Sequence, residues 1–296
     1  MTALSKKKLN ESAVFAIFTI PALICILLSV EIPFLMSVGY SFTKWNGLDK
    51  IPEFIGLENY REALFHDPDM LRALIFTISL TLATVILINI IALALAVLLD
   101  RDIRGMNALR AAFYIPNIIS LIIIGYVWRF IFSQGFDSLY ELTGWSIFQL
   151  SWLGDGKMAF LSISIVTTWQ AIGFYLVIYL AGLQTVPREL IEASMLDGAN
   201  FFTRFFYITL PTILPSITVA VFYSLSHGLK AFDVIMSLTN GGPGTATMSI
   251  ALDIYRSAFI ISRFGYGTAK SVILFILIMI FTVFQVKMFK QREVEL

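Results

Sequence analysis

The chain has 296 residues, of which 58% are hydrophobic and 14% charged, and its net charge is +1. Soluble domains carry about 45–50% hydrophobic and about 25% charged residues, so a soluble protein of this length could not bury so much apolar surface. The composition also excludes a disordered chain, the single cysteine excludes a disulfide scaffold, and the balance of 21 basic and 20 acidic residues argues against nucleic-acid binding. A polytopic membrane protein remains.

Six apolar runs are near the length of about 20 residues that a helix needs to cross the hydrocarbon core. They are continuous, whereas the strands of a membrane barrel alternate in polarity, so we expect an all-α fold. The predicted spans are approximately 12–40, 73–99, 111–132, 158–183, 205–232 and 268–289, within one transmembrane domain over 1–296. The first run follows three lysines but lacks a cleavage site, and we interpret it as a retained helix.

Six spans place both termini on the same side of the membrane. Basic residues lie near span ends on both sides, so their total number separates the two orientations poorly. They are denser in the short segments on the side of the termini, and most acidic residues fall in the opposite loops. The sequence therefore predicts a cytoplasmic-membrane protein with both termini cytoplasmic.

The loop 184–204, after the fourth predicted span, carries signals for a short surface helix. Pro187 suits the first turn of a helix, Glu189 its positive end, and Gly198 a left-handed C-cap. We therefore expect a helix from Pro187 to Asp197 that lies across the membrane surface. Such a helix with small residues can enter a groove of a partner protein, and a generic interfacial linker is the alternative.

The segment from Glu192 to Pro215 reads EASMLDGA, then F-x-x-I-x-LP and a second proline. It resembles the EAA loop of permease subunits of bacterial ABC importers, with Ser194 in place of the third alanine. The resemblance implies a type I ABC importer permease fold, in which this loop is a coupling helix that docks on an ATPase subunit. The residues expected to make this contact are Glu192, Ala193, Ser194, Asp197 and Gly198.

Further segments resemble the carbohydrate-uptake branch of this family, in particular the maltose-permease F type. They are Trp169-x-x-x-Gly173-Phe174, Leu238-Thr239-Asn240-Gly241-Gly242-Pro243, and Pro21, Pro33, Gly56-Leu57 and Asn59-Tyr60. The resemblance covers nearly the whole chain, although the extra amino-terminal spans and large outer domain of the maltose subunit are missing. It implies a loop that faces an extracytoplasmic binding protein at Thr239, Asn240, Gly241, Gly242 and Pro243.

Hydrogen-bonding and aromatic side chains inside the fourth and fifth predicted spans indicate a route for a sugar. Such groups are costly toward lipid and should face the interior of the bundle. In the resembled family the F-type subunit carries a sugar site on these two spans. The substrate pathway expected from that resemblance is Thr167, Trp169, Phe174, Ser224, His227, Gly228 and Ala231. Ordinary helix packing is the alternative for each of them.

No catalytic or metal-binding pattern is readable in the sequence. The run Gly241-Gly242-Pro243-Gly244 lacks the lysine of a phosphate loop, and neither His66 nor His227 has a second ligand at metal-site spacing. The run Phe264-Gly265-Tyr266-Gly267 echoes a potassium filter but lacks the preceding Thr-Val pair. We therefore expect a chain without enzyme activity, metal or cofactor, with ATP and Mg²⁺ bound by a partner ATPase.

The resemblance predicts a permease subunit of an ATP-driven, binding-protein-dependent importer of a sugar or oligosaccharide that works by alternating access. Its expected partners are a second homologous permease subunit, two ATPase subunits and an extracytoplasmic sugar-binding protein. Two alternatives remain open: an ABC permease for a polyol or a glycerol-phosphate-type solute, and a secondary transporter driven by an ion gradient. The second usually shows more spans, internal repeats and buried ionisable groups.

Overall fold

The computed structural model describes residues 3–100 and 105–290, and the chain divides into two compact units. One unit comprises the chain up to His66 together with Ile254–Ile273, and the other comprises Asp67–Asp253 and the segment from Leu274 onward. Among the described residues the only strands are β1 (Thr43–Lys44) and β2 (Glu53–Phe54), and the remaining regular structure is helical. The expected all-α fold is therefore confirmed.

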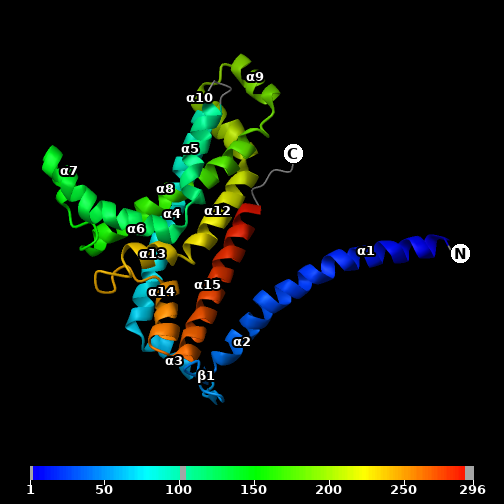
Figure 1. Ribbon diagram of the computed structural model, residues 1–296. Helices are drawn as coiled ribbons and strands as arrows, with labels where there is room; N and C mark the ends of the chain where they lie inside the picture. Colours follow the sequence, from blue (N-terminus) through cyan, green and yellow to red (C-terminus); the bar gives the residue numbers. More distant parts are fainter. Residues whose placement is uncertain (1–2, 101–104, 291–296) are drawn as a thin grey trace. The chain divides into compact units, whose positions relative to one another are not determined.

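The first unit begins with a long apolar helix. α1 (Ala3–Ile26) continues through the π-helical turn η1 (Leu27–Glu31) into α2 (Ile32–Tyr40), and Figure 1 draws them as one unbroken blue ribbon. The most apolar window of Ala13–Tyr40 has a mean hydropathy of 2.7 and is 0% buried. A helix that is apolar on all sides and exposed throughout is suited to lipid or to another chain.

A small hairpin follows this helix. β1 and β2 are antiparallel, with Thr43 opposite Phe54, and lead into α3 (Glu58–Phe65). The hairpin lies against the beginning of α15 (Phe264–Lys290), because the Gly265 N–H donates to the Trp45 carbonyl at 2.9 Å. An added Cβ at Gly265 would overlap the Thr43 carbonyl oxygen, so glycine permits this close approach. The end of α14 (Ile250–Tyr255) and the π-helical turn η5 (Arg256–Ile260) complete the unit.

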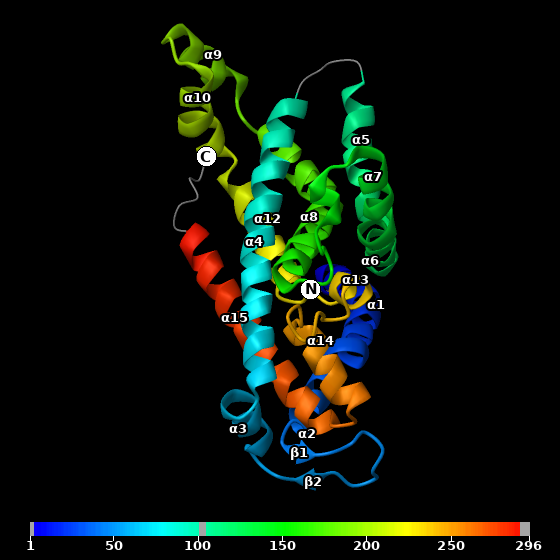
Figure 2. The same ribbon diagram turned by 90° about the vertical axis from the view of Figure 1, so that its left-hand side faces the viewer.

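The second unit is a bundle built around two long helices. α4 (Pro68–Leu99) packs along α8 (Gly156–Leu183), and α5 (Met106–Ile118) and α12 (Leu214–Gly228) pack against this pair, as Figure 2 shows. Ala92 and Ala96 of α4 meet Leu176 and Tyr179 of α8 in a fully buried cluster. Alanines at this contact let the two helices approach closely.

Both long helices begin before the predicted spans 73–99 and 158–183. The Asp67 carboxylate caps α4 by accepting hydrogen bonds from two backbone N–H groups, and Pro68 occupies the first turn. Asp155 caps α8 in the same way. Carboxylate caps stabilise polar first turns that lie outside the apolar run, so a search for apolar residues alone misses them.

The third and fifth predicted spans are each broken by a bend. The helix Met106–Ile118 meets the helical stretch Leu121–Thr143 at 94°, and Phe201–Thr212 meets α12 at 70°. Four unbent helices among the described residues could cross a membrane, and six spans result if each bent pair counts as one. The stretch Leu121–Thr143 consists of α6 (Leu121–Phe130), η2 (Ile131–Gly135) and α7 (Phe136–Thr143). The stretch Phe201–Thr212 consists of α10 (Phe201–Arg204), η4 (Phe205–Thr209) and α11 (Leu210–Thr212).

Prolines lie close to both bends. Pro116 is inside the last turn of α5, and Pro211 and Pro215 flank the break at Ile213. Proline removes a backbone donor and disfavours helical dihedrals in the residue before it, so the helical hydrogen bonds are interrupted there. The remaining short elements are η3 (Ser146–Gln149), α9 (Arg188–Leu196) and α13 (Asp233–Leu238). The prediction of one domain over 1–296 is not tested by these elements.

Candidate functional site

The loop after α8 forms the short helix that the sequence predicts. α9 spans Arg188–Leu196, one residue shorter at each end than expected, because Pro187 has extended dihedrals and serves as the N-cap. Gly198 has a φ of 79°, in the left-handed region that favours glycine. The Gly198 N–H donates to the Met195 carbonyl at 3.1 Å and the Ala199 N–H to the Ser194 carbonyl at 2.9 Å. This pair of bonds is a Schellman cap, and it ends the helix sharply.

Most of α9 is free of contacts with the rest of its unit. Ser194 is its one buried residue, 8% exposed, and its hydroxyl donates to the Ile191 carbonyl at 2.7 Å. Met195 and Leu196 are 52% and 90% exposed. Of the five predicted coupling residues, Ser194 faces inward, and the other four are exposed: Glu192, Ala193, Asp197 and Gly198. A helix that presents apolar side chains to the outside is suited to docking.

A hollow of about 840 Å³ lies beside α9. Its walls come from the ends of α4 and α8, from α9, and from the helix that begins at Phe201. It contains two arginines and two carboxylates, Arg188, Arg204, Asp100 and Glu192, among aliphatic and aromatic side chains. The hollow shows that α9 does not pack closely against the rest of its unit on this side.

A small cavity lies between α4, α6, α8 and the end of α12, in the second unit. Its volume is about 80 Å³. Four of the seven predicted pathway residues line it, namely Thr167, His227, Gly228 and Ala231. The structure therefore brings together part of the predicted set, from α8 and from the end of α12.

The other three predicted pathway residues do not line this cavity. Trp169 is two residues after Thr167 and so lies on another face of α8, where it is 41% exposed and contacts Trp128 edge to face. Phe174 is about two helical turns from Thr167, and its ring packs on Tyr223 at 4.8 Å. The third, Ser224, is 4% exposed and takes part in a hydrogen-bond network one turn from the cavity.

This network links three helices through one amide. Asn89 of α4 donates to the Ser224 hydroxyl of α12 at 3.0 Å and accepts from the Tyr179 hydroxyl of α8 at 2.5 Å. Its amide nitrogen also donates to the Val85 carbonyl at 2.7 Å. Ser224 therefore takes part in an interhelical hydrogen bond in this structure, and its role in a substrate pathway stays a prediction.

The sequence analysis missed the contribution of α4 to the cavity. Leu80 and Thr84 line it, and Thr81 lies against Gly228. Thr77, Thr81 and Thr84 recur every three or four residues, so they share one helix face. This threonine stripe in an otherwise apolar run was a readable signal for the interior face of α4.

The predicted outer loop at Thr239–Pro243 is tied together by its own hydrogen bonds. The Thr239 and Thr247 hydroxyls are 2.8 Å apart, and the Thr247 hydroxyl donates to the Gly242 carbonyl at 2.5 Å. Asn240 and Gly241 adopt positive φ values of 50° and 80°. These bonds fix the conformation of the loop, in which Asn240 is exposed and Gly241 is buried, and its contact with a binding protein stays a prediction. No group of three His, Cys, Asp or Glu side chains in the described part of the chain could hold a metal ion.

Apolar helices of membrane-spanning length, an internal cavity and an exposed helix after α8 define an integral membrane permease. The chain belongs to the family of binding-protein-dependent transport system inner membrane components, whose family model matches residues 106–293. The predicted family, the permease subunits of ABC importers, and the predicted permease fold are both confirmed.

Relatives match over nearly the whole chain. This chain is 41% identical to a probable starch degradation products transport system permease protein, AmyD, of Thermoanaerobacterium thermosulfurigenes, with 95% of each chain covered. It is 32% identical to the trehalose/maltose transport system permease protein MalF of Thermococcus litoralis, with 98% of each covered. Its fold resembles that of a chain in a bacterial ABC transporter involved in alginate import, with a TM-score of 0.82 at 21% identity over 96% of this chain and 98% of that one.

Proposed function

We propose that this chain is the permease subunit of an ATP-driven, binding-protein-dependent importer of a sugar or oligosaccharide. The observation that carries the proposal is the 41% identity, over 95% of both chains, to a permease named for starch degradation products. A further relative, 34% identical, is the multiple sugar-binding transport system permease protein MsmF of Streptococcus mutans, with 94% of this chain and 95% of that one covered. Their names agree on saccharides as cargo.

In the proposed mechanism α9 is the coupling helix. Glu192 and the exposed end of α9 contact an ATPase subunit, which binds ATP and Mg²⁺, and this chain itself is not an enzyme. Closure of the ATPase dimer draws the coupling helices together and rocks the spans between inward-open and outward-open states. The exposure of Met195 and Leu196, at 52% and 90%, and the hollow of about 840 Å³ beside the helix support such docking.

The cavity between α4, α8 and α12 is the proposed point of passage. At about 80 Å³ it is far smaller than the roughly 300–1,000 Å³ of pockets that enclose small-molecule ligands. Passage of a saccharide therefore requires the helices around it to separate, as alternating access provides. Thr167 and His227 would offer hydrogen bonds to the sugar hydroxyls, and Gly228 and Ala231 would leave room for its ring.

The proposed assembly contains a second homologous permease subunit, two ATPase subunits and an extracytoplasmic binding protein. One solved alginate ABC transporter is in complex with a pentasaccharide-bound periplasmic protein, and its fold matches this chain with a TM-score of 0.81. In the membrane both termini would be cytoplasmic, which places the loop at Thr239–Pro243 on the binding-protein side.

The cargo can be determined with the reconstituted transporter and its cognate binding protein. ATP hydrolysis is measured with a panel of maltooligosaccharides, disaccharides, polyols and glycerol phosphate. We expect stimulation by at least one saccharide. Stimulation by a polyol or glycerol phosphate alone would contradict the sugar assignment, and uptake that resists vanadate but collapses with an ionophore would indicate a secondary transporter instead.

A further inference from the structure

The first unit contains a polar cleft of about 650 Å³ that belongs neither to the cavity nor to α9. It lies between the hairpin loop that joins β1 to β2, the helix α3, and the turn that leads into α15. Its side chains are mainly hydrogen-bond acceptors. They include four carboxylates and one amide, Asp49, Glu53, Glu58, Glu62 and Asn59. Arg263 also lines the cleft.

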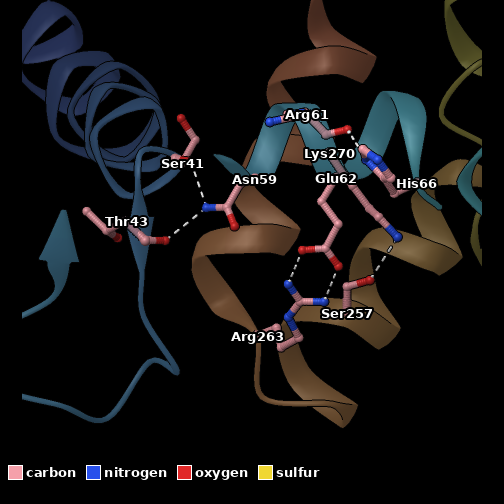
Figure 3. A network of polar contacts seen from close by, with 9 residues as sticks. All are labelled: Ser41, Thr43, Asn59, Arg61, Glu62, His66, Ser257, Arg263 and Lys270. Carbon is pink, nitrogen blue, oxygen red and sulfur yellow. Dashed lines mark hydrogen bonds and ion pairs between the residues drawn. The ribbon is translucent and has the colours of Figure 1, made fainter. Parts of the chain in front are cut away.

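One wall of the cleft is held in place by a network of charged and aromatic groups. Arg263 forms a bidentate ion pair with Glu62, at 2.7 and 2.6 Å, and its guanidinium lies 4.1 Å from the centre of the Tyr266 ring. The Lys270 ammonium lies 4.6 Å from the same ring and donates to the Ser257 hydroxyl at 3.2 Å (Figure 3). The positive charge of Arg263 is therefore already engaged by a carboxylate of the same wall.

The remaining charges of the cleft are predominantly negative. Asp49, Glu53 and Glu58 are exposed, and none of them forms an ion pair with any residue in 3–100 or 105–290. Lys44 is the other cation on the lining. Three carboxylates against one ammonium leave an excess of negative charge that attracts a cation.

Asn59 provides an independent indication of a ligand. It is 3% exposed, and its amide nitrogen donates to the Ser41 and Thr43 carbonyls, both at 2.9 Å. Two carbonyl acceptors identify that end of the amide as the nitrogen. The amide oxygen accepts no hydrogen bond from the described residues, and Figure 3 shows it turned away from the two carbonyls. The Asn59 oxygen is not among the fully buried side-chain atoms that lack a partner, so this otherwise buried side chain presents its acceptor at the surface of the cleft that it lines. A ligand that donates a hydrogen bond suits an acceptor in this position.

The surroundings of the cleft favour a polypeptide as the occupant. Leu48, Ile51 and Phe54, on the same hairpin, are 87%, 86% and 76% exposed. Large apolar side chains next to a charged pocket are typical of protein–protein contacts, in which apolar groups exclude water around a buried charge. A sugar hydroxyl is neutral, whereas an ammonium or guanidinium group only donates and also neutralises the excess negative charge of the lining.

We propose that this cleft receives a lysine or arginine side chain of the extracytoplasmic binding protein, with Asn59, Glu58 and Asp49 as the acceptors. The proposal rests on the function proposed above and names the chemistry of one of its contacts. The ammonium or guanidinium supplies the donor that the Asn59 oxygen lacks, and Leu48, Ile51 and Phe54 pack against the surface around it.

The test uses the whole transporter in lipid nanodiscs and its purified cognate binding protein. The variant Asp49→Lys/Glu58→Lys should weaken binding at least about tenfold at low salt, and the loss should shrink at high salt because the contact is electrostatic. The neutral variant Asp49→Asn/Glu58→Gln should show a smaller loss in the same direction. The control Asp137→Lys/Glu141→Lys makes the same charge change at two exposed carboxylates of α7 and should bind within about twofold of wild type.

A cross-link identifies the contact directly. In a Cys25→Ser background, Glu58→Cys carrying a short thiol-to-amine reagent should capture a defined lysine of the binding protein, and Glu141→Cys should not. Wild-type affinity in both Asp49/Glu58 variants, or equal loss in the α7 control, would overturn the proposal. These results leave the proposed function standing if wild-type ATP hydrolysis still responds to the sugar-loaded binding protein, whereas absence of that response in wild type would contradict the function itself.

Discussion

Single glycines set the distance between helices of the second unit. Gly173 of α8 lies against the backbone of α5, where an added Cβ would overlap the Phe113 carbonyl oxygen and the Tyr114 Cα. Gly125 of α6 lies against the side chain of Ser237 of α13, whose hydroxyl an added Cβ would overlap. Small residues at these contacts allow close packing where no hydrophobic force between helices is available in lipid.

Replacement of Gly173 by alanine should therefore destabilise the protein by about 1–3 kcal/mol, because the obstacle is backbone that cannot rotate away. Thermal unfolding in detergent measures the effect. Gly39→Ala is the matched control, since this helical glycine has no atom within 4 Å of the added Cβ, and it should leave the unfolding temperature unchanged or slightly raised. Equal stability of both variants would contradict the close approach.

Asn89 is the residue on which three helices converge. Its replacement by leucine leaves the buried Ser224 and Tyr179 hydroxyls without this partner. Interhelical hydrogen bonds in membranes average about 0.6 kcal/mol and reach about 1.7, so we expect a loss of about 1–3 kcal/mol for the two bonds. Tyr179→Phe, which removes one of these two hydrogen bonds, should show roughly half of this loss. Denaturant unfolding compares the variants, and an Asn89→Leu protein as stable as wild type would exclude the network as a source of stability.

The candidate pathway shows how far residue-scale prediction from the sequence reaches. The family resemblance grouped Thr167 and Trp169 in one predicted pathway, yet a separation of two residues puts them on different faces of α8. His227 and Gly228 are adjacent in the chain, and both line the cavity. The interhelical partner of Ser224 is Asn89, 135 positions away along the chain, and Tyr179, which also bonds to Asn89, lies 90 positions from it. No local pattern indicates such contacts.

At the scale of elements, the apolar runs indicated where the long helices lie and gave no information on bends. The 94° and 70° bends lie close to prolines, whereas the first helix carries Pro21 and Pro33 and is not among the bent pairs. Pro116, Pro211 and Pro215 could have indicated the two bends, but a search for charge-free runs takes no account of proline. The short helix α9 was predictable to within one residue at each end, because its proline and its glycine stand at its two ends.

The C-cap of α9 offers a test of coupling. Gly198→Asp introduces a side chain at φ 79°, which costs about 1–2 kcal/mol, and adds a charge at the proposed ATPase contact. We expect sugar uptake in cells to fall to background while the protein remains in the membrane. Gly144→Asp is the control, because Gly144 has a φ of 70° at the end of α7 and also has open space around it. Normal uptake by Gly198→Asp, or equal loss in Gly144→Asp, would contradict the role of α9 as coupling helix.

At the scale of the whole molecule, two apolar or exposed elements have no cover among the described residues. The first helix has an apolar window that is 0% buried, and α9 is largely exposed. The cavity of about 80 Å³ is too small for a saccharide. In the proposed assembly, further subunits would cover the two exposed helices, and movement of the spans would open the cavity. The composition predicted a membrane protein and the EAA-like loop predicted its family, whereas the partners' surfaces are encoded in other chains.

The most direct measurement is sugar uptake into proteoliposomes that contain the complete transporter, with its binding protein outside. The account predicts that uptake requires hydrolysable ATP inside the vesicles and sugar-loaded binding protein outside, and that it stops with vanadate. Uptake without ATP that is abolished by an ionophore, or uptake that does not depend on the binding protein, would contradict it.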